Sequence, residues 1–179
     1  MKILANLLDN QFPTAPIKEN RDIARALVCD EKGNFAFHHI IGDDIFGHRD
    51  YYETPGWGVD KGEDELEAVK RECYEEIGYR IEIIAPIGEV IDYYNLLGRK
   101  NLSHYYLAKR VGGFLGRHFV SEGDKMIKET KWISLSKAQE LYLLSDVTPI
   151  ARLVYAREVP VIKEAESIIK KQKIDILAK

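Results

Sequence analysis

One stretch, from Pro55 to Tyr79, constrains the fold of this 179-residue chain more than any other part of it. The stretch opens with a Pro-Gly turn and closes on Gly78, and between these breakers the sequence predicts a helix. Asp64 and Glu67 have the spacing of a capping box at the start of that helix. Four apolar residues then recur at helical spacing and are expected to face a core: Leu66, Val69, Cys73 and Ile77.

The same helix concentrates acidic side chains beside its apolar face. Glu72 and Glu76 are four residues apart and therefore lie one turn from each other, with Glu75 at their flank. Like charges at this spacing repel by roughly 0.2–0.5 kcal/mol per pair, so a compensating cation is expected. Mg²⁺ is the natural candidate because it takes oxygen ligands and keeps waters and phosphates in its shell. A solvated acidic helix face is the alternative interpretation of the spacing alone.

The order of the letters favours the metal site. The segment resembles the Nudix box, G-x(5)-E-x(7)-R-E-U-x-E-E-x-G-U, in which U is a bulky apolar residue. The residues before it, 53–56, look like the strand end that leads into the box in many members. We therefore interpret the chain as similar to the Nudix (MutT-like) hydrolases. The fixed positions of the box are occupied, in order, by Glu63, Arg71, Glu72, Glu75, Glu76 and Gly78.

One position departs from that pattern. The opening glycine of the box should fall at residue 57, where this chain has Trp57. Glycine usually supplies a positive φ or a close backbone approach, and Gly56 and Gly58 flank the tryptophan, so the turn can keep its path. Two further interpretations are that Trp57 stacks on a substrate base or that it blocks the pocket.

The resemblance implies an activity. Similar proteins hydrolyse a nucleoside diphosphate linked to another group X, and the products are a nucleotide and X-phosphate. Pyrophosphate would be repelled by bare carboxylates, whereas Mg²⁺, or Mn²⁺ in its place, reverses the local field and lowers the pKa of bound water. The metal ligands implied by the resemblance are Glu72, Glu75, Glu76 and the carbonyl of Gly56.

The resemblance also assigns supporting roles. Arg71 would orient its neighbouring carboxylate by a charge-assisted hydrogen bond, and Glu63 would support the turn or an outer metal. The general base is a box glutamate or a glutamate from the loop before the last strand, where Glu122 and Glu129 are the candidates; loop charge is the alternative for both. The expected substrate-binding residues are Trp57 and Tyr94, and a core or surface tyrosine is the alternative for the latter.

Composition limits the class of protein. Hydrophobic residues make up 45% and charged residues 31% of the chain, as in a globular protein. The net charge of −3 gives no basic excess, so no standing nucleic-acid partner is expected. Cys29 and Cys73 are expected to be core residues in a reducing compartment. No apolar run has the length that spans a bilayer, so the expectation is a cytoplasmic protein without a membrane partner.

The order of elements predicts an α/β fold with a mixed sheet, in agreement with the Nudix fold, a mixed β-sheet sandwiched between α-helices (α/β/α). Residues 1–20 are expected to form an arm, 21–146 the Nudix domain and 147–179 a helical extension. His38 and His39 are expected to place one ring in the core and one in solvent, and contact with a metal or a phosphate is the alternative. Strands are expected at 21–29 and 35–41 (a hairpin), 51–54, 80–94 (bent at Pro86 and Gly88), 102–109 and 131–133; loops at 43–50, 96–101 and 119–130; helices from Ser136, from Thr148 and again after Pro160.

Two other classes of function remain open. A non-catalytic Nudix-fold nucleotide-binding or sensor module is one, because Trp57 replaces the first glycine of the box. A structural or interaction subunit that uses its two termini is the other. The expected partner is a small nucleotide or nucleotide-like diphosphate. Homodimers are common among similar proteins, and the arm, the glycine-rich segment 112–116 and the tail are each candidates for that contact.

Overall fold

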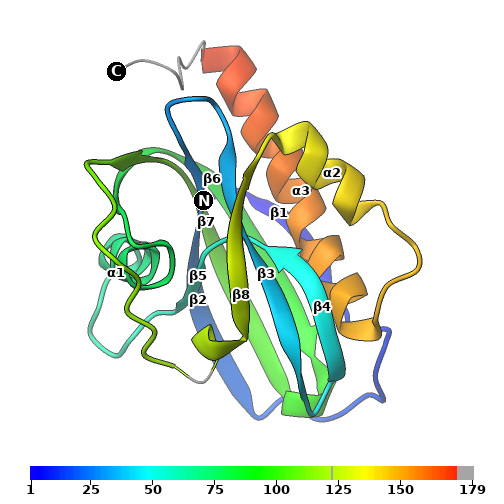
Figure 1. Cartoon of the computed structure of the whole chain (residues 1–179). Helices are drawn as coiled ribbons and strands as arrows, with labels where there is room; N and C mark the ends of the chain where they lie inside the picture. The colour runs from blue at the N-terminus through cyan, green and yellow to red at the C-terminus, as the bar shows by residue number, and fades with distance from the viewer. Residues whose placement is uncertain (122, 173–179) are drawn as a thin grey trace.

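A mixed sheet lies between helices on its two faces, and the expected α/β/α architecture is confirmed (Figure 1). The computed structural model describes residues 1–121 and 123–172. The strands are β1 (Ile3–Leu7), β2 (Glu19–Cys29), β3 (Phe35–Asp44), β4 (Gly47–Glu53), β5 (Gly56–Gly58), β6 (Arg80–Tyr94), β7 (Arg99–Val111) and β8 (Ile127–Ile133). The helices are α1 (Glu65–Ile77), α2 (Leu135–Tyr142) and α3 (Pro149–Gln172), with short 3-10 turns at Asn95–Leu97 and Asp124–Met126.

The sheet order is β1-β6-β7-β2-β3-β4, with β5 paired to β2 and β8 paired to β3. Two of these pairs, β1 with β6 and β2 with β7, are parallel, and the others are antiparallel. The long β6 runs antiparallel to β7 and is interrupted by irregularities at 83–85 and 86–88, which confirms the bend expected at Pro86 and Gly88. The parallel register of β2 and β7 sets Arg99 beside Glu19 and Asn101 beside Arg21.

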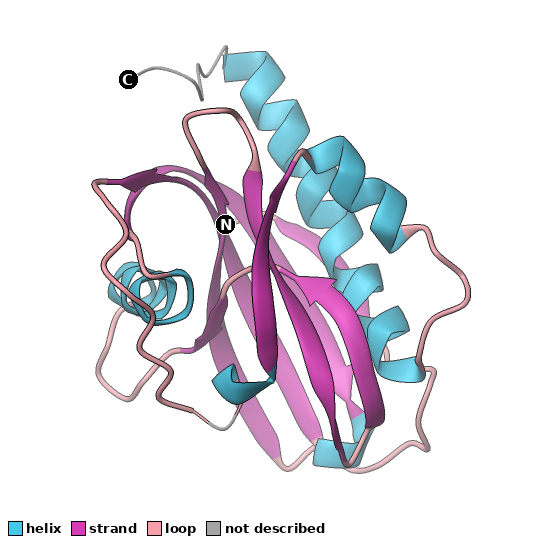
Figure 2. Ribbon diagram, in the orientation of Figure 1, coloured by secondary structure: helices cyan, strands magenta, loops and turns pink. Residues whose placement is uncertain are grey.

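Each face of the sheet has its own apolar core, because side chains alternate along a strand. On β2, Ala24, Ala26 and Val28 belong to the core under α1, whereas Leu27 and Cys29 belong to the core under α2 and α3. Figure 2 shows the strands between these two helical layers. The expectation that both cysteines are buried core residues is confirmed, and neither forms a disulfide.

The polar segment 43–50, expected as a loop, is instead the tight end of the β3–β4 hairpin. Asp43 pairs with His48 and Asp44 with Gly47, whose φ of 86° suits the turn. Polar residues on two exposed strand ends have the composition of a loop, which explains the wrong prediction. The expected hairpin between 21–29 and 35–41 forms only at its closed end, where Cys29 pairs with Phe35.

The other predicted loops are also shorter than expected. The segment 96–101 holds a 3-10 turn and the start of β7, and the segment 119–130 already enters β8 at Ile127. Ser134, rather than Ser136, begins α2, because its hydroxyl accepts the Lys137 amide at 3.2 Å.

The two helices expected from Thr148 and after Pro160 form one continuous helix, α3. Pro160 removes one backbone donor, but Val161, Ile162 and Ala165 beyond it are buried in the same core as Ile150 and Val154 before it. Burial of both halves on the sheet therefore outweighs the lost hydrogen bond. In the described part of the chain, no helix is long and apolar enough to span a membrane. The β1 strand in the segment 1–20 pairs with β6, and residues 173–179 of the expected extension lie outside the described residues.

Candidate active site

Helix α1 carries the acidic group, and its ends are set by local sequence. The Asp64 carboxylate caps the helix by accepting the amides of Leu66 and Glu67 at 2.8 and 2.9 Å. At the other end Gly78 adopts φ 73°, and its amide bonds the carbonyl of Tyr74. Both predicted ends of the helix are thereby confirmed.

The apolar face of α1 packs on the sheet as predicted, except at one position. Val69, Cys73 and Ile77 are buried against the alanines of β2. Leu66 is 42% exposed, so its predicted place in the core was wrong. It lies in the first turn of the helix and packs less closely than the residues of the later turns. The neighbours of the buried face, Glu72 and Glu76, are only 5% and 4% exposed.

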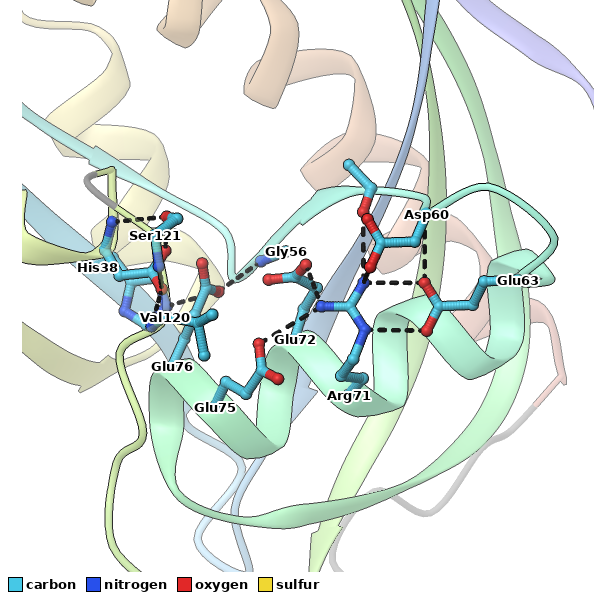
Figure 3. Close-up of polar contacts among 12 residues, drawn as sticks. His38, Gly56, Asp60, Glu63, Arg71, Glu72, Glu75, Glu76, Val120 and Ser121 are labelled. Atoms are coloured by element: carbon cyan, nitrogen blue, oxygen red, sulfur yellow. Dashed lines mark hydrogen bonds and ion pairs between the residues drawn. The ribbon is translucent and has the colours of Figure 1, made fainter.

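Arg71 is the cation of this site, and it contacts three of the box glutamates (Figure 3). Its Nε and Nη2 donate to Glu63 at 2.9 and 2.8 Å, and its Nη1 donates to Glu72 at 2.6 Å and to Glu75 at 3.3 Å. The hydrogen bond from Arg71 lowers the pKa of Glu63. Glu63 also accepts the backbone amide of Asp60 at 3.2 Å, so it connects the turn to the helix.

Glu76 is held by different partners from those of Glu72. Its Oε2 accepts the backbone amide of Gly56 at 2.7 Å and lies 3.2 Å from Nε2 of His38. The other ring nitrogen of His38 lies 3.0 Å from the hydroxyl of Thr130 on β8. His38 is 2% exposed, which agrees with the expected core position for one of the two histidines, while His39 is partly exposed.

Gly56 provides the conformation that the missing glycine at position 57 would otherwise supply. Its φ is 125°, and a Cβ there would overlap the carbonyl oxygen of Ala24. Gly56 therefore retains the turn, and the side chain of Trp57 extends into a neighbouring cavity. There its ring lies 5.2 Å from the guanidinium of Arg21.

Negative charge at the site exceeds what Arg71 compensates. Burial, and then the charge of Glu76, raise the pKa of Glu72 to about 7 despite its hydrogen bond from Arg71. The pKa of Glu75 is also raised, chiefly by burial, with smaller contributions from Asp124 and Glu76. A cation bound near these oxygens would stabilise their ionised forms.

The donor set fits a hard divalent cation. Arg71 occupies one oxygen of Glu72 and one of Glu75, and Gly56 occupies one oxygen of Glu76, so each carboxylate has a second oxygen to offer. Within the described residues, no three carboxylate, imidazole or thiol groups converge on one point as a complete protein cage. A bound Mg²⁺ would therefore complete its shell with oxygen atoms of water and phosphate.

Not all predicted site residues lie together. Glu129 contacts Lys131 at 3.3 Å and His39 at 3.6 Å, on the opposite face of β8 from Thr130, so the structure does not bring it to the α1 carboxylates. Glu122, the other predicted base from that loop, lies outside the described residues. Tyr94 is buried in the wall of the cavity beside Trp57, and its hydroxyl is 3.2 Å from Arg157.

Several residues of this region were not singled out from the sequence. Asp124 is 5% exposed and accepts the amides of Val120 and Ser121 at 2.8 Å, which orders the loop near Glu75. The sequence feature that could have identified Asp124 is its position in a turn, where an Asp side chain commonly bonds nearby backbone amides, but the segment around it has only the composition of a polar loop. Arg21 and Arg99 reach the cavity from two strands, and no local pattern marks them.

The sequence profile of the NUDIX domain matches residues 19–157. The chain belongs to the NUDIX family. The match runs from β2 to α3 and includes the whole box helix, so the predicted family is confirmed.

Relatives of this NUDIX protein agree with the assignment. A 55-residue part is 39% identical to an RNA pyrophosphohydrolase from Brucella anthropi, and it covers 30% of this chain and 32% of that protein. The chain thus spans about a third of the length of that relative.

Solved structures share the fold at low identity. A NUDIX hydrolase from Nitrosomonas europaea superposes with a TM-score of 0.63 and 15% identity, over 83% of this chain and 90% of that one. A MutT protein from Methanosarcina mazei Go1 gives a TM-score of 0.56 and 20% identity, over 87% and 98% of the two chains.

Proposed function

We propose that this NUDIX protein is a divalent-metal-dependent hydrolase that cleaves the diphosphate of a nucleoside diphosphate linked to another group X. The observation that carries the proposal is the pair Glu72 and Glu76, buried and one turn apart, with Arg71 as the one arginine that hydrogen-bonds either of them among the described residues. Burying two carboxylates is costly unless their charge is neutralised. A metal ion bound to a diphosphate supplies that neutralisation.

The reaction is a displacement at phosphorus. Water attacks one phosphorus atom of the diphosphate, the bond to the bridging oxygen breaks, and a nucleotide and X-phosphate result. A bound Mg²⁺ or Mn²⁺ would supply charge neutralisation of the phosphates and acidification of the attacking water. Glu72, Glu75 and Glu76 would hold it, with the carbonyl of Gly56 as a further ligand.

The other residues of the box position these groups. Arg71 fixes one oxygen of Glu72 and one of Glu75, so that the second oxygen of each faces the ligand. Glu63 fixes Arg71 by two hydrogen bonds. We assign proton removal from water to Glu75, because it is the most exposed of the three box carboxylates on α1 and burial raises its pKa. Glu122 is the alternative that mutation separates from it, since Glu129 lies away from the α1 carboxylates.

Separation of the hydrolysis products by chromatography, after incubation with Mg²⁺ or Mn²⁺, tests the proposal on a panel of nucleoside triphosphates, nucleotide sugars, ADP-ribose, dinucleoside polyphosphates and 5′-triphosphorylated RNA. The last substrate is included because of the activity named for the Brucella relative. Glu76→Gln and Glu75→Gln are expected to lower kcat by about 10²–10⁴-fold. Glu82→Gln, at an exposed glutamate paired with Lys109, is the control and should keep full activity.

The competing function is nucleotide binding without catalysis. The positive φ at Gly56 supports the catalytic proposal, since the turn does not need a glycine at Trp57. An assay that compares Trp57→Gly with the unsubstituted protein distinguishes hydrolysis from nucleotide binding without catalysis. Binding of nucleotides without formation of hydrolysis products by either protein, over the whole panel, would contradict the hydrolase proposal and leave a sensor.

A further inference from the structure

Two adjoining cavities open beside β5, on the face of β2 that carries Arg21, Ile23 and Arg25. The larger measures about 310 Å³ and the smaller about 60 Å³, and both have Trp57 in their walls. The larger lies in the range of sites for small ligands, about 300–1,000 Å³. Arg21 in the cavity wall connects this region to the α1 carboxylates, because the charge of Glu72 partly offsets the decrease that burial causes in the pKa of Arg21.

The walls of these cavities are strongly basic in a chain whose net charge is −3. Among the described residues, five arginines and two carboxylates line them. Such a concentration of guanidinium groups in a concave surface favours anions. The lining charged residues are Arg21, Arg25, Arg49, Arg99 and Arg157, with Asp44 and Glu53.

Four of the five arginines have carboxylate partners, and in three of these pairs the carboxylate lies in the cavity walls themselves. Arg25 and Arg157 are each 2% exposed and contact Glu53 at 3.2 and 2.7 Å. Arg49 contacts Asp44 at 2.6 Å. These three give the cavity its shape and part of its potential, but the neighbouring carboxylates offset their charges.

The other two, Arg21 and Arg99, have donors to spare. Arg99 gives only its Nε to Glu19, at 2.9 Å, among the contacts of the described residues. Arg21 forms no hydrogen bond or ion pair with any described residue, although it is wedged between the Trp57 ring and the Cα of Gly58. The two arginines come from neighbouring parallel strands, since Arg99 pairs with Glu19 and Asn101 with Arg21.

Arg21 and Arg99 lie close enough to repel one another. Burial of Arg21 and then the nearby charge of Arg99 lower the pKa of Arg21, although Glu19, Glu72 and Asp60 act in the opposite direction. The cavity wall therefore holds two neighbouring cations, of which Arg21 has no hydrogen-bonded carboxylate among the described residues. An anion placed between them would remove the repulsion, and the planar guanidinium matches phosphate through paired hydrogen bonds.

We propose that Arg21 and Arg99 bind a phosphate group that the substrate carries in addition to its diphosphate, with the Trp57 ring covering the part that connects the two. The inference rests on the proposed function, because the diphosphate of the same molecule lies at the α1 carboxylates. It narrows the substrate class to diphosphates that bear a further phosphate.

Matched pairs of substrates test the proposal. NADPH and NADH differ by one phosphate, as do coenzyme A and 3′-dephospho-coenzyme A, while UDP-glucuronate and UDP-glucose differ by a carboxylate. We expect kcat/KM to be at least about tenfold higher for the phosphorylated member of one pair or more, since hydrogen bonds to charged groups contribute about 1.5–3 kcal/mol. A preference confined to the carboxylate pair would overturn the assignment to phosphate.

Substitutions of the two arginines test whether they cause the preference for the substrate with the further phosphate. Arg21→Gln and Arg99→Gln are expected to remove it, with the loss in KM rather than in kcat. Arg110→Gln is the matched control, because Arg110 also lies on β7 and also donates its Nε to a glutamate, Glu31, but away from the cavity. Arg21→Gln should not lower the melting temperature, because it relieves repulsion. A preference that survives both substitutions overturns the proposal.

A binding measurement separates this inference from the proposed function. Tryptophan fluorescence, measured in EDTA, follows the binding of adenosine 2′,5′-bisphosphate, adenosine 3′,5′-bisphosphate and adenosine 5′-monophosphate. Tighter binding of a bisphosphate that depends on Arg21 and Arg99 supports the phosphate site even if no substrate is hydrolysed. Hydrolysis without any preference within the pairs overturns the phosphate site and leaves the hydrolase. If the protein neither binds the bisphosphates nor hydrolyses any substrate, both the phosphate site and the hydrolase proposal are overturned.

Discussion

The backbone amide of Gly56 donates a hydrogen bond to Oε2 of Glu76 across 2.7 Å. This bond connects the turn before α1 to the last turn of that helix (Figure 3), so the two ends of the box meet at one carboxylate. The bond requires the backbone path that only glycine adopts easily, φ 125° at Gly56. Conformation and chemistry are therefore coupled at this residue.

Gly56→Ala is expected to lower the free energy of unfolding by at least about 3 kcal/mol and to abolish hydrolysis. A Cβ at this position would overlap the carbonyl oxygen of Ala24 and come within 2.7 Å of the Cα of Arg25. Gly113→Ala is the control, because no atom lies within 4 Å of its Cβ position. Urea denaturation of both variants measures the difference, and equal midpoints would contradict the argument.

Glu72→Gln is expected to stabilise the metal-free protein above neutral pH. The pKa of Glu72 is about 7 in the folded protein and about 4.3 in an unfolded chain, so the folded state binds more protons between these values. Stability from this group is therefore present at low pH and is lost as pH rises through about 7. Thermal melts in EDTA should show the variant above the unsubstituted protein at pH 8, by up to about 3 kcal/mol, and little difference at pH 5.

Magnesium is expected to raise the melting temperature more at pH 8 than at pH 5.5. The ion competes with the proton on Glu72, whose pKa is about 7, so its apparent affinity falls as pH decreases. Melts with and without 1 mM Mg²⁺, roughly a thousandfold above a micromolar Kd, would give a shift equivalent to about 4 kcal/mol at most. The shift should shrink in Glu72→Gln, and an equal shift at both pH values would argue against binding at this carboxylate.

Arg157→Met is expected to cost about 3–5 kcal/mol of stability, because it leaves buried carboxylates without their cation. Arg157 contacts Glu53 at 2.7 Å and Glu158 at 2.9 Å, and Glu158 is bonded to the hydroxyl of Thr54. Arg152→Met, on the exposed side of the same helix, is the control and should change stability little.

The same variant reports on how α3 supports the active site. Glu53 and Thr54 come just before the Gly56 turn, so loss of Arg157 should also lower kcat at temperatures where the protein remains folded. Circular dichroism and kinetics on the same samples distinguish a lower kcat of the folded variant from a loss of activity caused by unfolding. Unchanged kcat in a fully folded Arg157→Met would limit the role of α3 to stability.

The box helix could be predicted from sequence because its determinants are local. A cap at Asp64, apolar spacing to Ile77 and a left-handed residue at Gly78 act within a few turns of one another, and each is confirmed. The exception, Leu66, lies in the first turn, where periodicity cannot tell whether the sheet extends far enough to cover a side chain. The acidic spacing likewise placed Glu72 and Glu76 one turn apart.

Predictions failed where a tertiary contact outweighed local composition. The segment 43–50 reads as a loop, but pairing across the β3–β4 hairpin makes it strand. Pro160 reads as the end of a helix, but the core on both sides of it keeps α3 continuous. In each case the stabilisation comes from residues distant in sequence, which a short window does not contain.

The sequence by itself determined the family, the box helix and the acidic group, since these depend on residues within 23 positions of one another. Only the tertiary structure decided what surrounds that group. Arg21 and Arg99 are 78 residues apart and meet at one cavity wall because β2 and β7 lie parallel in the sheet. Strand pairing is chosen by the burial of both sheet faces over the whole chain, and no local pattern carries that information.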